Sequence, residues 1–290
     1  MDLGDASLRT VRILGQGTFG RVFLCLQREG RNERKVCVKR IIMRNPKSEL
    51  ALIKEEIYII SQLRHPHIVQ FLRYFMHSGT VNIVMEYAPN GTMRDVIQRT
   101  SQNANGLLDE PRLLRFFSDM ILGLEYLHIR HVIHRDIKPE NMLLDANDRV
   151  KYADFGISNV HAPDKQQPWQ VLGTPLYMAP EIMCGAKCDF KSDIWSLGLV
   201  LYELCIGRNP FEALLRPNDP FAQVRNVVKA MAQPRLDCQV MRRRYEPIWA
   251  RLCESMVVYK PEKRICLPDL ISIDPHITHS IYGRYFKYDY

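Results

Sequence analysis

The sequence predicts an α+β fold in two parts, a small β-rich lobe with one helix followed by a larger, mainly helical lobe. Short β-branched and aromatic runs, bounded by glycine, asparagine and charged turns, dominate residues 8–87. After Pro89-Asn90-Gly91 the apolar residues change to the three-and-four spacing of amphipathic helices. We therefore expect a short linker near residues 86–91 to join the two lobes.

The same patterns predict the individual elements of each lobe. In the first lobe the predicted strands are 11–14, 22–26, 35–41 and 81–87. One helix over residues 49–63 interrupts them, because its apolar residues recur at helical spacing before Pro66 stops it. In the second lobe the predicted helices are 92–99, 111–130, 193–207, 220–232 and 246–257.

Composition excludes several classes of protein. The 290 residues are 46% hydrophobic and 25% charged, which argues against a disordered or fibrous chain. No apolar run reaches the ~18 residues that a membrane span requires, and the acidic start is unlike a secretory signal. The net charge of +8 accompanies no nucleic-acid-reading motif, so we expect no nucleic-acid partner. The eight cysteines lack zinc-ligand spacing and are expected to be reduced thiols in a soluble, cytoplasmic protein.

A glycine-rich turn lies between the first two predicted strands. Gly15-Gln16-Gly17-Thr18-Phe19-Gly20 fits the pattern G-x-G-x-x-G. A dinucleotide-binding turn would open a helix, whereas the residues after Gly20 look like a strand. Strand, loop and strand suit a glycine hairpin whose backbone N–H groups lie over the phosphates of a nucleotide. An ordinary tight hairpin is the alternative.

Lys39 lies in the middle of a predicted strand, on the same face as Cys37 because side chains alternate along a strand. A lysine among apolar neighbours requires an anionic partner, either phosphate oxygens or a carboxylate. Glu56, beside the apolar stripe of the predicted helix, is the candidate carboxylate and Glu55 is its rival. A solvated edge lysine is the alternative for Lys39.

The most specific motif is His134-Arg-Asp136-Ile-Lys138-Pro-Glu-Asn141, followed 13 residues later by Asp154-Phe-Gly156. At average residue usage, the four fixed residues of H-R-D-x-x-x-x-N occur by chance in roughly two of a thousand chains this long. An acid, an amide and a second acid on loops of the helical lobe make a set of hard oxygen ligands. Such ligands suit magnesium that bridges phosphate oxygens.

By these residues, and by Ala179-Pro-Glu181, the sequence resembles the eukaryotic protein kinase family over roughly residues 8–275. A lysine two residues after Asp136, here Lys138, resembles the pattern of the serine/threonine branch. The sequences around Asp136 and Glu181 resemble those of the NIMA-related subgroup. The resemblance implies a two-lobed protein-kinase-like fold with an antiparallel N-lobe over 8–87, a hinge at 86–91 and a C-lobe over 91–275. Residues 1–7 would be an N-terminal extension and 276–290 a short tail.

The resemblance also implies site residues and substrates. Lys39, paired with Glu56, would hold the α- and β-phosphates of ATP. Asp136 would accept the proton of the substrate hydroxyl, or at least orient that hydroxyl, and Lys138 would steady the γ-phosphate. Asn141 and Asp154 would hold Mg²⁺. The residues expected around ATP, besides Lys39, are Leu14, Gly15, Gln16, Gly17, Thr18, Phe19, Gly20, Val22, Cys37, Met85, Glu86, Ala88 and Leu143.

The resemblance also bears on how the activity is switched. In kinases of this pattern, a residue like Arg135 commonly pairs with a phosphate in the activation segment, which Glu181 closes here. No Ser, Thr or Tyr lies between Asn159 and Gly173, so we expect activity without phosphorylation. Phosphorylation of Thr174 or of Ser158 is the alternative.

Beyond the predicted hinge, the uncharged Thr92 predicts that substrates carry a neutral or apolar residue three positions before the acceptor, although Glu140 is an available acid.

The expected function is transfer of the γ-phosphate of ATP to Ser or Thr of protein substrates. A pseudokinase scaffold and a small-molecule phosphotransferase are the alternatives. The expected address is the cytoplasm, with the nucleus and cytoskeleton as further possibilities.

Overall fold

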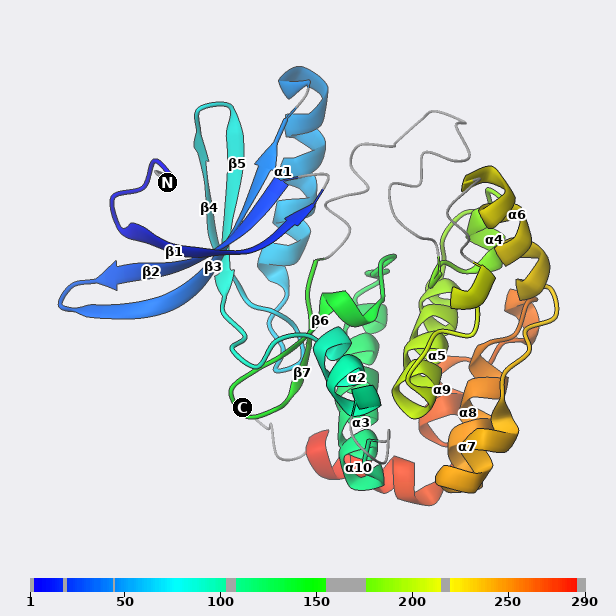
Figure 1. Cartoon of the computed structure of the whole chain (residues 1–290). Coiled ribbons are helices and arrows are strands. Elements are labelled where there is room, and N and C mark those ends of the chain that lie inside the picture. The colour runs from blue at the N-terminus through cyan, green and yellow to red at the C-terminus, as the bar shows by residue number, and fades with distance from the viewer. Residues whose placement is uncertain are drawn as a thin grey trace.

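The computed structural model describes residues 3–17, 20–43, 45–102, 108–154, 176–214 and 220–285. Figure 1 shows a sheet-containing lobe and a helical lobe, with the chain passing from one to the other after β5. The predicted α+β architecture and two-lobed arrangement are confirmed. None of the helices in these ranges is both long enough and apolar enough to cross a membrane.

The first lobe is a five-stranded antiparallel sheet with one helix against it. The strands are β1 Leu8–Gly17, β2 Gly20–Glu29, β3 Asn32–Ile42, β4 Phe71–His77 and β5 Thr80–Glu86, and the helix is α1 Pro46–Gln62. Their order in the sheet is β1-β2-β3-β5-β4. One face packs on α1 through Ile53 and Ile57, and the other buries Phe23 and Val38. Both faces of the central strands are therefore covered.

β4 was not expected from the sequence. It lies at the edge of the sheet, where β5 is its neighbour among the described strands, and a register shift between Phe71 and Arg73 interrupts its ladder. Only Phe71 is buried and the other side chains of β4 are half-exposed or exposed, so its sequence shows no clear alternation of apolar and polar residues. Edge strands with mixed polarity give a weak pattern of this kind.

The second lobe is built around two long buried helices, α3 Glu110–Ile129 and α5 Phe190–Ile206. Asp189 caps α5 in a capping box with Ser192, and Gly207 ends it in the left-handed conformation. Around them lie α2 Met93–Gln102, α4 Pro180–Met183, α6 Pro220–Met231, α7 Cys238–Arg244, α8 Pro247–Met256 and α9 Leu267–Ile271. Short 3-10 turns are η1 Pro139–Asn141, η3 Glu212–Leu214 and η4 Pro261–Lys263.

The expected short tail contains a further helix, α10 Pro275–Tyr285, which packs against α3. Ile277 and Ile281, four residues apart, are buried against the core, and Asp274 accepts the backbone N–H of His276 at 2.9 Å. Ser280 and Ser118 of α3 share a hydrogen bond of 2.9 Å. An aspartate followed by proline and an apolar pair at i, i+4 is a helix-start pattern that the sequence reading missed.

A small two-stranded sheet lies where the lobes meet. Its strands are β6 Met142–Leu144 and β7 Val150–Tyr152. The backbone of Tyr152 accepts a hydrogen bond from Val69 at 2.8 Å and donates one to His67 at 2.9 Å. The segment between α1 and β4 is therefore attached to the helical lobe, which fixes how the two lobes face each other.

Candidate active site

The loop from His134 to Asn141 is shaped by Asp193 in the first turn of α5. This buried carboxylate accepts the backbone N–H of His134 at 2.9 Å and of Arg135 at 3.0 Å. The two N–H groups converge because Arg135 has a φ of 70°, a conformation that L residues rarely adopt without surrounding support. Asp193 therefore supports the backbone directly before Asp136.

His134 connects the two acidic segments of the site. Its Nδ1 accepts the backbone N–H of Asp136 at 3.3 Å, so Nε2 carries the proton and donates to the carbonyl of Ala153 at 3.1 Å. Burial lowers the pKa of His134, in agreement with a neutral ring in this tautomer. The ring thereby holds Asp136 and Asp154 at a set separation.

Asp136 lies among the donors that its own loop provides. Lys138 Nζ donates to both carboxylate oxygens, at 2.9 and 2.7 Å, and Asn141 Nδ2 donates to Oδ2 at 2.7 Å. The same amide nitrogen donates to the Asp136 carbonyl at 2.9 Å. Asp136 and Lys138 each keep about a third of the side chain exposed, at 32% and 34%, so both are accessible from solvent.

Lys39 of β3 forms an ion pair with Asp154 of the helical lobe. Burial raises the pKa of Asp154, but the neighbouring Lys39 ammonium outweighs it and holds the pKa below its usual range. The predicted partner, Glu56, belongs to α1, and its side chain, like that of Glu55, lies outside the described part of the chain. The choice between these two glutamates stays a prediction.

Cys37 and Lys39 lie on one face of β3, as strand alternation predicts. Burial, with a smaller contribution from the neighbouring Asp154 charge, raises the pKa of Cys37 to about 12. A thiol with this pKa is protonated at neutral pH, in agreement with a small apolar residue and not a reactive nucleophile.

The residues expected around ATP come mainly from β1, β2 and β3 and the short strands between the lobes. In register, Val22 lies opposite Lys39, and Cys37 lies between Leu24 and Met85. Leu143 is the half-exposed residue of β6, between two buried neighbours. Gln16 and Gly17 end β1, whereas Thr18 and Phe19 lie outside the described residues.

Gly20 has a steric reason to be glycine. Its φ is 148°, and a Cβ at this position would lie 1.8 Å from the backbone oxygen of Arg40. The close approach of β2 to β3 therefore excludes any side chain here. This brings the glycine turn down against the strand that carries Lys39.

Residues 86–91, the predicted hinge, are held by contacts that no motif indicated. Glu86 accepts the backbone N–H of Gln70 at 2.8 Å and the ammonium of Lys151 at 2.7 Å. Asn90 donates from its side chain to the carbonyl of Asp145 at 2.7 Å, and Leu144 donates to Gly91 at 2.9 Å. The segment on either side of Ala88 is thus attached to both lobes.

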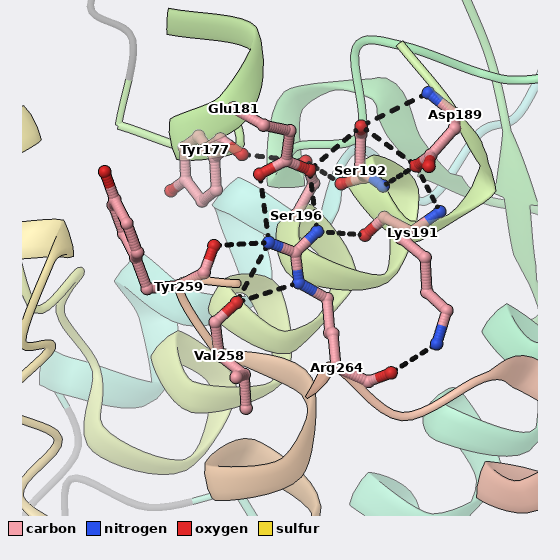
Figure 2. A network of polar contacts seen from close by, with 9 residues as sticks. All are labelled: Tyr177, Glu181, Asp189, Lys191, Ser192, Ser196, Val258, Tyr259 and Arg264. Atoms are coloured by element: carbon pink, nitrogen blue, oxygen red, sulfur yellow. Dashed lines mark hydrogen bonds and ion pairs between the residues drawn. The ribbon is translucent and has the colours of Figure 1, made fainter. Parts of the chain in front are cut away.

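Glu181 forms a buried ion pair with Arg264 (Figure 2). The guanidinium donates to the two carboxylate oxygens at 2.8 and 3.0 Å and to the carbonyls of Val258 and Lys191. Ser192 donates to the same carboxylate at 3.1 Å. Glu181, the predicted end of the activation segment, is therefore fastened to the helical core. Thr174 and Ser158 lie outside the described residues, so the two views of phosphorylation stay predictions.

A second charged cluster lies beside the Asp136 loop and was missed by sequence reasoning. Arg94 of α2 donates to Glu140 at 2.7 Å, to Tyr177 at 2.5 Å and to the buried Glu203 of α5. Tyr177 also donates to Glu203. Glu140, which the sequence left available for a basic substrate residue, is thus already paired with a cation of the same chain.

The donor set fits a magnesium ion. Asn141 uses its amide nitrogen on Asp136, which leaves the amide oxygen as the ligand atom, and Asp154 supplies a carboxylate with a lowered pKa. Mg²⁺ is commonly held by one or two protein oxygens together with water and substrate phosphates. Within the described ranges, no cluster of three His, Cys, Asp or Glu side chains makes a different metal site.

Comparison with known proteins agrees with this geometry. The protein kinase domain family matches residues 8–274, nearly the whole chain.

This chain belongs to the protein kinase family.

Among its relatives are three serine/threonine-protein kinases. Nek8 of Danio rerio is 35% identical over 90% of this chain and 35% of its own length. Nek5 of Homo sapiens is 38% identical over 70% of this chain and 28% of its own length. Nek3 of Mus musculus is 39% identical over 70% of this chain and 38% of its own length. The resemblance to NIMA-related kinases is therefore confirmed. The chain spans about a third of the length of these curated relatives.

Proposed function

We propose that this protein kinase transfers the γ-phosphate of ATP to Ser and Thr hydroxyls of protein substrates. The observation that carries the proposal is the meeting of Lys39 from the sheet lobe with Asp154 from the helical lobe. His134 contacts the backbone of Asp136 and of Ala153, the residue before Asp154, so one ring connects the segments that carry the two carboxylates. Phosphoryl transfer depends mainly on such positioning and charge neutralisation.

Each side chain would act on a stated part of the reaction. Lys39 would hold α- and β-phosphate oxygens through charge-assisted hydrogen bonds, and Lys138 would neutralise the γ-phosphate. Asp136 would orient the acceptor hydroxyl or take its proton as the new P–O bond forms and ADP leaves. Asn141 and Asp154 would hold Mg²⁺, which supplies charge neutralisation to the phosphate oxygens when bound.

The unit responsible is proposed to be residues 8–275, with a hinge at 86–91. The contacts of Glu86 with Lys151, and of Asn90 with Asp145, support a hinge at this place. The cytoplasmic address stays a prediction.

The test is transfer of the γ-phosphate of ATP to casein or myelin basic protein, compared between the wild type and Asp136→Asn. We expect phosphate on Ser or Thr with the wild type and a loss of about 10²–10⁴-fold with Asp136→Asn, the usual range for a positioned acid or base. Binding of ATP without transfer would make the chain a pseudokinase scaffold. Transfer only to small molecules would make it a different phosphotransferase.

A further inference from the structure

A cavity of about 380 Å³ lies in the helical lobe, between the end of α3, the start of α5 and α9. Its walls are mainly apolar, with Ile129, Phe190, Ile194, Leu267 and Pro268 among the lining side chains. The volume is at the lower end of the range of ligand-binding cavities. It holds one or two large apolar side chains, or a small organic molecule.

The apolar surface continues outside the cavity. Ile129 is 68% exposed and Phe190 is 37% exposed. Phe190 is held in place by the ring of His128, whose centroid lies 4.7 Å away. A cavity that opens onto exposed apolar side chains offers a longer contact than a small molecule uses, and surfaces of this kind mark protein–protein contacts.

The charged residues that line the cavity differ in whether they have hydrogen-bond partners. Asp189 accepts the backbone N–H groups of Lys191 and Ser192 at 2.8 and 3.2 Å, and Lys191 Nζ donates to the carbonyl of Arg264 (Figure 2). Glu125, by contrast, makes no hydrogen bond or ion pair with any residue that the structure describes. Burial alone raises its pKa, with no neighbouring charge to oppose that effect.

We propose that this pocket is a docking site for a short peptide segment of a partner protein, with an apolar anchor side chain next to a lysine or arginine. The anchor would fill the cavity, and the cation would pair with the Glu125 carboxylate. A neutral peptide would bury this carboxylate further without a partner, and an acidic peptide would repel it, so both bind more weakly. The residues on either side of the anchor would lie over Ile129.

The site is separate from the proposed catalytic residues and does not rest on the proposed function. One wall residue, His128, donates to Asp193 at 3.0 Å, and Asp193 supports the loop before Asp136. Variants at His128 would therefore disturb the loop as well as the pocket. Glu125 and Ile129 are the positions to change, because they contact the pocket without this connection.

The probes are fluorescein-labelled synthetic peptides in which each large apolar residue is combined with a neighbouring Lys, Gln or Glu. We expect the Lys peptides to bind the full chain at least ~10-fold more tightly than their Gln counterparts, as for a partly desolvated charge pair. Glu125→Gln should remove most of this difference and leave the Gln peptides unchanged. Ile129→Asp should weaken every peptide.

Two controls test whether the peptides bind at this pocket. Glu212→Gln removes an exposed carboxylate beyond the opposite end of α5 and should change nothing. The thiol of Cys266, which lines the pocket, should be alkylated more slowly when a bound peptide covers it, as measured by mass spectrometry.

Four results would each overturn the proposal. They are a library without a binder, equal affinity for Lys and Gln peptides, a Lys preference that survives Glu125→Gln, and unchanged alkylation of Cys266. Concentration-dependent self-association that Ile129→Asp abolishes would assign the surface to a second copy of the chain instead.

Discussion

Replacing Arg264 with methionine tests whether the buried ion pair holds the helical lobe together. The guanidinium is fully buried and donates to both oxygens of Glu181 and to the carbonyls of Val258 and Lys191. Methionine fills similar space without a donor, so, among the residues that the structure describes, the Glu181 carboxylate keeps only Ser192 as a partner. Breaking a buried pair in this way costs about 3–5 kcal/mol of unfolding free energy.

The expected change is large enough to measure by two methods. With an unfolding entropy of about 2.1 cal/mol/K per residue, the 290-residue chain should lose roughly 5–8 °C in Tm. Urea unfolding followed by tryptophan fluorescence gives the free energy directly. Trp195 is a suitable local probe, because its ring lies 5.2 Å from the Arg264 guanidinium and is fully buried.

Arg242→Met is the matched control. Arg242 pairs with Glu254 at the surface, where both side chains are 44% exposed, and this change should cost less than ~1 kcal/mol. Adding Glu181→Gln to Arg264→Met should recover part of the loss, because it removes the unpaired charge. Equal stability of Arg264→Met and Arg242→Met would refute the reasoning, as would a double variant that loses the sum of both single changes.

Three further predictions follow from the site and its surroundings. Lys39→Met should lower turnover at least ~10²-fold while the protein still binds ATP weakly. Single-turnover assays measure the transfer rate and fluorescent-nucleotide titration measures nucleotide binding. An unchanged turnover with only a raised KM for ATP would contradict this prediction. Arg94→Ala should release Glu140 to pair with a substrate arginine three positions before the acceptor. The preference for arginine there should rise about threefold, as for an exposed ion pair of about 0.7 kcal/mol. An unchanged profile in a positional peptide library would argue against this prediction. Burial lowers the pKa of His67 to about 3, below its value in the unfolded chain. The unfolded chain therefore takes up the proton first, and stability falls as pH drops from about 6.5, by up to ~1.4 kcal/mol per unit. Urea unfolding between pH 6.5 and 4.5 should show a shallower slope for His67→Gln, and equal slopes would contradict the assignment.

Backbone periodicity is the part of this protein that its sequence determined most directly. Alternation along a strand placed Cys37 and Lys39 on one face of β3, and the three-and-four spacing located α1, α3 and α5 to within a few residues. The residues between His134 and Asn141 are close in sequence, so one loop brings them together. Weak patterns were missed, as for the edge strand β4 and for α10.

Only the tertiary structure decided which distant groups meet. Lys39 and Asp154 are 115 residues apart, Arg94 and Glu203 are 109 apart, and Lys151 reaches Glu86 across the lobe boundary. A chain with 40 basic and 32 acidic residues permits many such pairs, and charge alone does not choose among them. The choice depends on packing, because Coulomb attraction is strong only where folding brings two charges within a few ångströms and excludes water between them.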